Sequence, residues 1–259
     1  AATQTLVELS RDRRYLGAQI GILAILHTWS QTLIYHPHLH CIVTGGGLSE
    51  DRRYWVPGRR DFFLPIRVLS RLFRGKMLAG LQAAVETGQL TRPAGTASDP
   101  FGRLYDQEWV VYCKAPFAGP DKVLDYLARY THRVAISNDR LVALDEDTVS
   151  FRYRDGDQQP QTMALPVEEF IRRFLQHVLP DRFVKIRYYG LWSNRQRHQR
   201  LAHCRRLLGQ RPPPRTEPLT WQQWLHQLTG TDPTRCPQCQ QGVMMPYRIL
   251  LPADQRAPP

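Results

Sequence analysis

The residues best suited to chemistry are two histidines, His38 and His40, which stand one residue apart shortly before three glycines at positions 45–47. Alternate side chains of a β-strand share a face, so a strand here would hold both imidazoles side by side. Imidazole is a common ligand of divalent metals, so the motif predicts two ligands of a metal site. Histidines near a sheet end also occur without a metal, and only a third ligand elsewhere decides between the two interpretations.

The segment before these histidines predicts where a third ligand comes from. Apolar residues recur at helical spacing over residues 16–33, which predicts an amphipathic helix leading into the histidine strand. His27 and Gln31 are polar exceptions near the end of this helix. Because Gln31 lies shortly before His38, it is close enough to return beside the strand, and we expect it to be the third ligand.

A second group of reactive side chains lies on a helix predicted over residues 122–133 and capped by Asp121. Tyr126 and Tyr130 are four residues apart and so share a helix face, while Arg129 and Arg133 form a neighbouring row. Such a tyrosine pair most often packs in a core or an interface. Guanidinium groups beside it, however, would bind a phosphate near the phenol oxygens and favour the phenolate.

Together the two groups predict cleavage of a phosphodiester. A metal held by the histidines would act as a Lewis acid on the phosphate, and a tyrosine hydroxyl would attack phosphorus and form a covalent phosphotyrosine. No nucleoside triphosphate is needed, because the ester conserves the bond energy.

The chain is strongly basic, with a net charge of +12 and a pI near 9.9. Its excess of arginine favours phosphate recognition, because the guanidinium group matches phosphate oxygens and stays charged. Residues 185–215 carry many of these cations and no acid. The side chains expected to contact DNA are Arg129, Arg133, Lys185, Arg187, Arg195, Arg197 and Arg200.

Composition also restricts the class of protein. No apolar run approaches the ~20 residues that a membrane span needs. The 5 cysteines, an odd number, argue against a disulfide framework and favour a reducing, cytoplasmic setting. The chain starts with alanine, so we expect it to be part of a longer protein.

The sequence predicts three parts. Residues 1–190 would form the catalytic domain, residues 191–210 a basic DNA-binding helix, and residues 211–259 a proline-rich linker followed by a small C-terminal module.

The C-terminal module contains Cys236 and Cys239, a Cys-x-x-Cys pair that is half of a zinc ribbon. Structural zinc takes four ligands, and Cys204 is the expected third. The histidines that remain open as the fourth ligand are His198, His203 and His226. The alternative is a reduced pair, or a site completed by a segment outside this chain.

The remaining segments show both helical and strand periodicity. Helices are predicted over residues 66–86, 167–179, 193–208 and 219–228, and a loop or a short hairpin around residues 54–56. Strands are predicted over residues 1–10 (as a strand or an arm), 108–114, 134–137, 140–144, 148–154, 161–165 and 183–189.

These residues resemble a known family. His38-Leu-His40 is similar to the histidine-hydrophobic-histidine motif of the HUH endonucleases, and Tyr126-Leu-Ala-Arg-Tyr130 to the two-tyrosine motif of the rolling-circle transposases. The chain resembles transposases of bacterial insertion sequences and ISCR elements most clearly at residues 36–47, 63–71 and 129–138. The similarity extends over roughly residues 5–210.

The resemblance implies an α+β fold with a central antiparallel sheet flanked by helices. It also implies an enzyme that uses Mg²⁺ or Mn²⁺ to nick single-stranded DNA at an element end. One tyrosine would become attached to the 5′ phosphate and free a 3′ hydroxyl, and the second would allow strand transfer for rolling-circle transposition. The family's third metal ligand varies, so His132 and His36 stay open beside Gln31. The amino-terminal cysteine-rich module of the family is absent here, which again suggests a truncated chain.

Two other classes remain. A metal-dependent nuclease without a covalent intermediate would not need the tyrosines. A DNA-binding or recombination-accessory protein would cleave nothing with any metal. Covalent capture of DNA distinguishes the two-tyrosine transposase from both of these classes.

Overall fold

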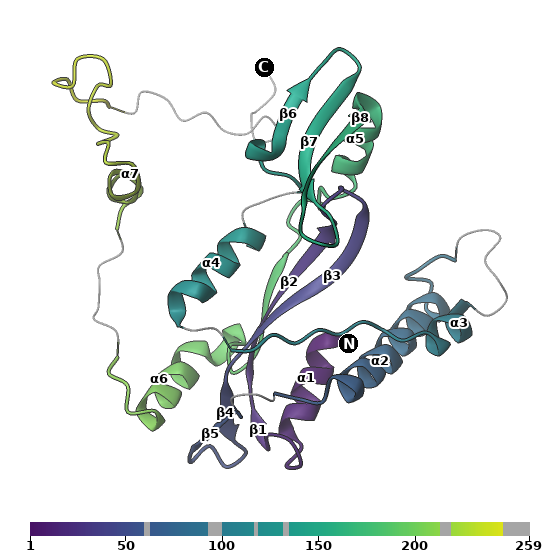
Figure 1. The fold of residues 1–259 in the computed structure, drawn as a ribbon. Coiled ribbons are helices and arrows are strands. Elements are labelled where there is room, and N and C mark those ends of the chain that lie inside the picture. Colours follow the sequence, from purple (N-terminus) through teal and green to yellow (C-terminus); the bar gives the residue numbers. More distant parts are fainter. Residues whose placement is uncertain (60–62, 93–99, 117–118, 132–134, 213–218, 246–259) are drawn as a thin grey trace. The chain divides into compact units, whose positions relative to one another are not determined.

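The computed structural model describes residues 1–59, 63–92, 100–116, 119–131, 135–212 and 219–245, and the side chains of residues 100 and 129–131 are not described. The chain divides into two compact units, residues 1–211 and residues 212–259. The described residues of the first unit form a mixed α+β structure with three antiparallel sheets of three strands each, rather than one central sheet (Figure 1).

The sheet that carries the histidines has the strand order β3-β2-β9. Its strands are β2 (Gly21–Trp29), β3 (Tyr35–Val43) and β9 (Ile186–Gly190). The helix predicted over residues 16–33 is therefore wrong. β2 is the central strand, and nearly all of it is buried. Its apolar run does not alternate, and in such a run periodicity does not distinguish a strand from a helix.

One face of this sheet is covered by α4 (Pro120–Thr131), which begins two residues before the predicted start. Buried Leu23, Ile25 and Ile42 of the sheet pack against Val123 and Leu127 of the helix. Residues 123 and 127 are one helical turn apart, so this apolar stripe fixes which side of α4 faces the sheet.

The second sheet is the predicted meander, confirmed for β6 (Leu141–Leu144), β7 (Thr148–Arg154) and β8 (Pro160–Pro166). Helix α5 (Val167–Leu175) packs on it, and buried Phe151 and Leu165 form a core that includes Leu33 from the β2–β3 turn. Of the strand predicted at residues 134–137, residues 135–137 are not a strand, and the short η1 (Asn138–Arg140) follows them.

The third sheet joins β1 (Ala18–Gln19), β4 (Gly46–Ser49) and β5 (Trp55–Pro57), so the hairpin prediction is confirmed. The helix α1 (Ala2–Arg11) comes before these strands in the chain, and the next helices after them are α2 (Ile66–Glu86) and α3 (Pro100–Asp106). The bounds predicted for α2 are confirmed. The strand or arm expected at residues 1–10 is wrong, because Thr5 and Leu9, four residues apart, are buried on one face of α1.

Residues 108–114 do not form the predicted strand. They run beside α2 without a ladder partner among the described residues, and two α2 side chains bond to carbonyls at the start of this segment. Ser70 donates to the Trp109 carbonyl and Arg74 donates to the Gln107 carbonyl.

Beyond β9 the first unit ends with η2 (Asn194–Gln196) and α6 (Arg197–Leu207), which are close to the predicted helix. Gly190 opens this connection with φ +62°, and a Cβ there would lie 2.0 Å from the Ile20 carbonyl oxygen, so only glycine fits. The second unit contains α7 (Trp221–Thr229) with a Thr220 capping box. No helix among the described residues is long and apolar enough to span a membrane.

Candidate metal and tyrosine site

Three histidines meet on one face of the β3-β2-β9 sheet. In the antiparallel register His27 of β2 lies opposite His38 of β3, and Ile25 lies opposite His40. Residues that face each other across such a ladder share a face, so His27, His38 and His40 project together. One possible ligand atom of each lies within 4.8 Å of the others, and His27 Nδ1 is 3.0 Å from His38 Nε2.

The backbone fixes the tautomer of the central histidine. His38 Nδ1 lies 2.7 Å from the His36 carbonyl oxygen. A carbonyl only accepts, so Nδ1 carries the proton and Nε2 keeps a lone pair directed toward His27. A backbone carbonyl that orients a ligating imidazole in this way is typical of metal sites.

Burial keeps two of the imidazoles neutral. It lowers the pKa of His27 to about 3, with smaller contributions from His38, His40, Lys185 and His177. It lowers the pKa of His40 to about 4, assisted by His38 and Lys114. Only neutral imidazole has a lone pair for a metal, so the cluster is ready to bind a cation at neutral pH.

These pKa shifts predict that the protein loses stability in mild acid. The unfolded chain protonates histidines near pH 6.5, whereas His27 and His40 stay neutral to about pH 4 in the fold. The unfolded state then binds more protons, so the free energy of unfolding should fall as the pH drops from about 6.5 toward about 4. Urea unfolding at about pH 7 and pH 5, where carboxylates contribute little, measures this loss. The His27→Gln/His40→Gln variant should show a weaker pH dependence, and equal wild-type stability at both pH values would contradict the prediction.

Tyr126 reaches this cluster from α4. Its side chain packs with Val123 and Leu127 against the sheet, because positions 123, 126 and 127 share one helix face. The hydroxyl oxygen lies 2.6 Å from His40 Nδ1, and the two rings meet edge to face. The expected juxtaposition of a tyrosine with the histidine motif is therefore present.

The structure describes only some of the other predicted site residues. Gln31 is exposed in the β2–β3 turn, where its carbonyl accepts from Arg140. His36 is exposed, with its ring 5.1 Å from that of His38. Tyr130 and Arg129 lie on α4, but their side chains are outside the described residues, as are His132 and Arg133 entirely.

His27 is the site residue that the sequence reasoning missed. The helical prediction treats it as a polar exception. A histidine in an apolar run, just before a turn and a second strand, instead indicates a residue that faces a partner across two strands. A hairpin interpretation of residues 21–43 would have placed it opposite the His-x-His motif.

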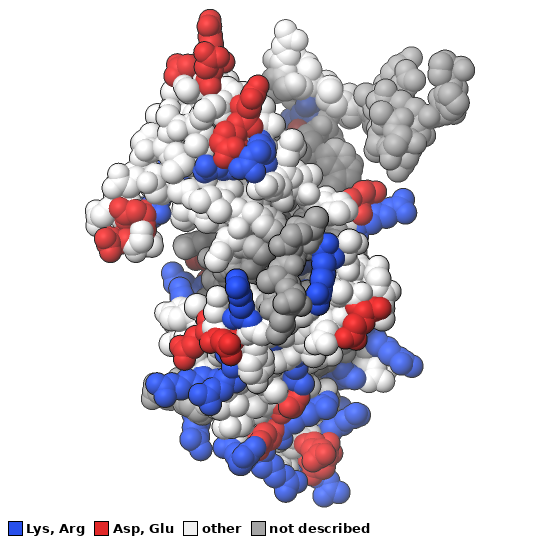
Figure 2. All heavy atoms as spheres, turned by 90° about the vertical axis from the view of Figure 1, so that its right-hand side faces the viewer, with Lys and Arg blue, Asp and Glu red and all other residues white. Residues whose placement is uncertain are grey.

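The basic residues around β9 are partly engaged with the protein itself. Lys185 Nζ lies 4.9 Å from the centre of the Trp29 ring, and Arg197 lies over Tyr188. Arg200 donates to the Gly190 carbonyl and to Ser193 Oγ, so it closes the turn after β9. Arg187 donates to the Val184 carbonyl, and Arg195 is exposed. Figure 2 shows Lys and Arg side chains interspersed with acidic ones over one face of the molecule.

The cysteines lie in both units. Cys204 is buried in the first unit with Leu48 and Leu191, and burial raises the pKa of its thiol. Cys236 and Cys239 belong to the second unit. There the Gly242 backbone N–H donates to Cys239 Sγ and, with other local hydrogen bonds, lowers the pKa of that thiol. The zinc site stays a prediction.

One protein family and two curated proteins match this chain. Residues 21–200 match the model of the family Y2_Tnp, described as "Putative transposase". The chain is 49% identical over 264 residues to "Putative transposase y4qJ" of Sinorhizobium fredii (strain NBRC 101917 / NGR234), covering 96% of this chain and 66% of that protein. It is 30% identical over 250 residues to "Transposase for insertion sequence element IS801" of Pseudomonas savastanoi pv. phaseolicola, covering 91% of this chain and 58% of that protein. The chain thus spans less than two thirds of the length of either relative. No solved structure gives a significant match.

Proposed function

Because this chain belongs to the Y2_Tnp transposase family, we propose that it nicks and joins single-stranded DNA at the ends of a mobile element. The reaction passes through a 5′-phosphotyrosine on Tyr126 and serves rolling-circle transposition. The observation that carries the proposal is the contact between the Tyr126 hydroxyl and His40 within the histidine cluster.

The three imidazoles fit a divalent metal. Their ligand atoms come from two hydrogen-bonded strands, so little ordering is needed to bring them to one cation. A bound cation would act as a Lewis acid that stabilises charge on the phosphodiester oxygens. His27, His38 and His40 would hold it, and His27 takes the place predicted for Gln31.

His40 connects the metal ligands to the nucleophile. A coordinating imidazole carries its proton on its other ring nitrogen. For His40 that nitrogen would be Nδ1, 2.6 Å from the Tyr126 oxygen. The ring then donates to this oxygen and stabilises the phenolate, as a positioned charge-assisted hydrogen bond does.

The chemical step is a displacement at phosphorus. Tyr126 loses its hydroxyl proton to solvent water, and its oxygen forms a bond to phosphorus while the bond from phosphorus to the 3′ oxygen breaks. That oxygen takes up a proton and leaves as a free 3′ hydroxyl. The reverse attack by another 3′ hydroxyl on the phosphotyrosine joins strands without a nucleotide cofactor. Tyr130, one turn along α4, would hold a second strand in the same way.

The donor set predicts which metal binds. Mg²⁺ prefers oxygen ligands in near-ideal octahedral geometry, whereas imidazole nitrogens suit transition metals. We therefore expect Mn²⁺ or Co²⁺, and not Mg²⁺, to raise the melting temperature. At a concentration of about 100 times Kd the stabilisation should be about 2.7 kcal/mol. Thermal unfolding of the chelator-treated protein with each metal measures this effect. Equal stabilisation by Mg²⁺, or none by any metal, would contradict the three-histidine site.

The proposed function is tested with 5′-labelled and 3′-labelled single strands from element ends, and the same sequences as duplexes. After incubation with Mn²⁺ and denaturing electrophoresis, the 5′-labelled fragment should end in a free 3′ hydroxyl. The 3′-labelled fragment should be linked to the protein through its 5′ phosphate. Cleavage without a linked product would indicate a metal-dependent nuclease without a covalent intermediate. Binding without cleavage would indicate a DNA-binding or recombination-accessory protein.

A further inference from the structure

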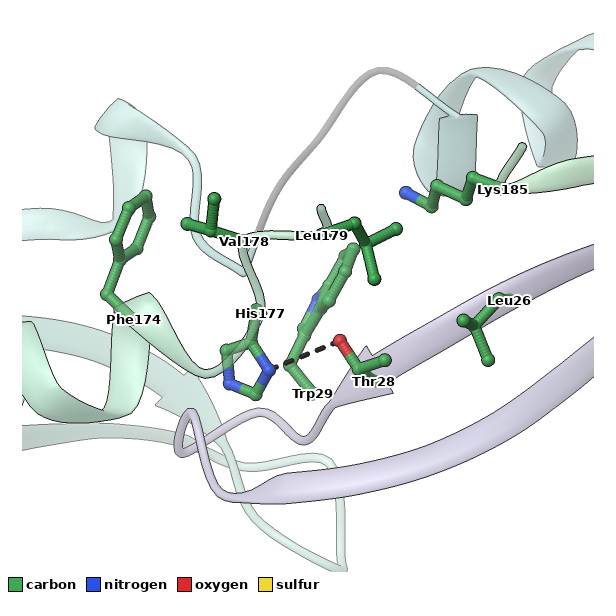
Figure 3. A pocket seen from close by; sticks show the side chains of 8 residues that line it. All are labelled: Leu26, Thr28, Trp29, Phe174, His177, Val178, Leu179 and Lys185. Carbon is green, nitrogen blue, oxygen red and sulfur yellow. Dashed lines mark hydrogen bonds between the residues drawn. The ribbon is translucent and has the colours of Figure 1, made fainter. Parts of the chain in front are cut away.

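We propose that a cavity beside the histidine cluster binds one base of the single-stranded DNA and thereby sets the register of the strand at Tyr126. The inference rests on the proposed function, because it assumes a single strand at the histidine cluster. The cavity measures about 350 Å³. Its lining residues are Leu26, Thr28, Trp29, Phe174, His177, Val178, Leu179 and Lys185 (Figure 3).

The walls of the cavity are suited to a flat aromatic ring. Trp29 and Phe174 are aromatic, and Leu26 and Leu179 supply aliphatic surface. Bases stack on aromatic side chains irrespective of their sequence, because every base has a π face. The volume is at the lower end of the range of about 300–1,000 Å³ typical of small-molecule sites, which suits a single base.

The floor of the cavity is rigid. His177 and Thr28 are buried, with 1% and 4% of their surfaces exposed. His177 Nδ1 lies 3.2 Å from Thr28 Oγ1, and Nε2 lies 3.0 Å from the Leu33 carbonyl oxygen. The polar groups of Thr28 and His177 are hydrogen-bonded within the protein, so the cavity offers a mainly apolar surface.

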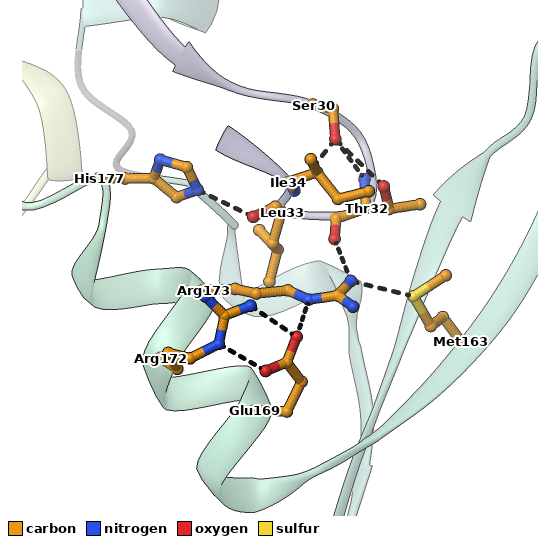
Figure 4. A network of polar contacts seen from close by, with 9 residues as sticks. All are labelled: Ser30, Thr32, Leu33, Ile34, Met163, Glu169, Arg172, Arg173 and His177. Carbon is orange, nitrogen blue, oxygen red and sulfur yellow. Dashed lines mark hydrogen bonds and ion pairs between the residues drawn. The ribbon is translucent and has the colours of Figure 1, made fainter. Parts of the chain in front are cut away.

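Polar contacts hold α5 against the β2–β3 turn next to this floor (Figure 4). Arg173 donates to the Thr32 carbonyl, 3.0 Å away, and pairs with Glu169, which also pairs with Arg172. This network fixes the helix that carries Phe174 relative to the turn after β2, so both aromatic walls are preorganised.

The cavity adjoins the proposed metal site through Trp29. The centres of the Trp29 and His27 rings are 3.9 Å apart, while the Trp29 ring also lies 5.9 Å from His177 on the cavity floor. Leu26, which lines the cavity, alternates with His27 along β2 and faces the other side of the strand. The ladder with β9 ends at Ile25, and beyond it the Trp29 ring lies at this edge of β2 between His27 and the cavity. A phosphodiester at the histidine cluster therefore lies across this strand edge from the cavity. A base adjacent to that phosphodiester can turn into it.

The charge at the cavity favours a nucleotide over an apolar peptide. Lys185 extends along one end of the cavity in Figure 3, with Nζ 4.9 Å from the Trp29 ring centre. An ammonium group there attracts the phosphate attached to the bound base. Stacking surface and a cation together are the two components of single-strand binding sites.

The test uses the full chain and a single-stranded oligo(dT) in which 5-iodouracil replaces thymine. On irradiation this base cross-links to the aromatic side chain on which it stacks, and peptide mapping identifies the residue. We expect cross-links at Trp29 or Phe174. Leu179→Phe fills the cavity and should abolish these cross-links and weaken oligo(dT) binding about tenfold. The matched control is Leu175→Phe, an exposed position outside the cavity that should change neither result.

The outcomes separate the cavity from the proposed function. Cross-links confined to other residues, or unchanged cross-links and affinity in Leu179→Phe, would overturn the base site. If the wild type still formed the DNA–tyrosine adduct, the proposed function would stand without it. A wild-type chain that neither bound nor cleaved single strands would overturn both. The wild-type cross-link decides the question even if Leu179→Phe does not fold.

Discussion

His27→Ala should abolish metal binding and lower metal-dependent nicking by more than about 100-fold, because even a residue that only orients a metal ligand costs about 10–100-fold when removed. His27 faces His38 across the ladder at 3.0 Å and completes the three-histidine cluster. Titration calorimetry with Mn²⁺ and single-turnover nicking measure the two losses. Single-strand affinity should stay within about threefold, because it depends on cations and stacking.

The matched controls are the other ligand candidates. His36→Ala removes an exposed imidazole next to His38, and Gln31→Ala removes an exposed amide in the β2–β3 turn. Both variants should bind the metal and nick DNA like the wild type. Loss of metal binding in Gln31→Ala with His27→Ala unaffected would show that the third ligand is the one that the sequence predicted.

Tyr126→Phe should eliminate the first covalent DNA adduct and slow nicking by about 10⁴-fold or more, the scale seen when a covalent nucleophile is removed. Phenylalanine keeps the packing of the ring against Leu23, Ile25 and Ile42 but removes the oxygen that meets His40. Denaturing electrophoresis of labelled single strands measures both effects.

Tyr112→Phe is the control for this change, because Tyr112 is 76% exposed and lies outside the cluster. Tyr130→Phe should leave the first adduct and reduce strand transfer. Wild-type rates of adduct formation in Tyr126→Phe would exclude Tyr126 as the first nucleophile.

Sequence patterns predicted the structure correctly where the spacing of apolar residues fits only a helix or only a strand. The long stripe of α2 and the alternating strands β7 and β8 have buried and exposed sides, so their side-chain spacing identifies them. β2 has no exposed side, because α4 packs on one face and the segment around His177 packs on the other. Its apolar residues fit a helix and a strand equally well. Because the segment was predicted as a helix, His27 was not recognised as a metal ligand.

The site could be predicted only in part for the same reason. The spacing of His38 and His40 and the position of Tyr126 on a helix can be predicted from the neighbouring sequence alone. Their meeting depends on a contact across 86 residues, which follows from the packing of α4 on the sheet and not from any local pattern. The third histidine depends on strand register, which the turn geometry and the bulge between His27 and Trp29 determine.

The central claim is that Tyr126 is the nucleophile of a three-histidine metal site. It is tested most directly by trapping the wild-type adduct with Mn²⁺, digesting protein and DNA, and locating the nucleotide-bearing residue by mass spectrometry. The account predicts a 5′-phosphonucleotide on Tyr126 that is absent when His27, His38 or His40 is replaced by alanine. A nucleotide on a residue remote from the histidine cluster, or an adduct that forms equally well in the histidine variants, would contradict it.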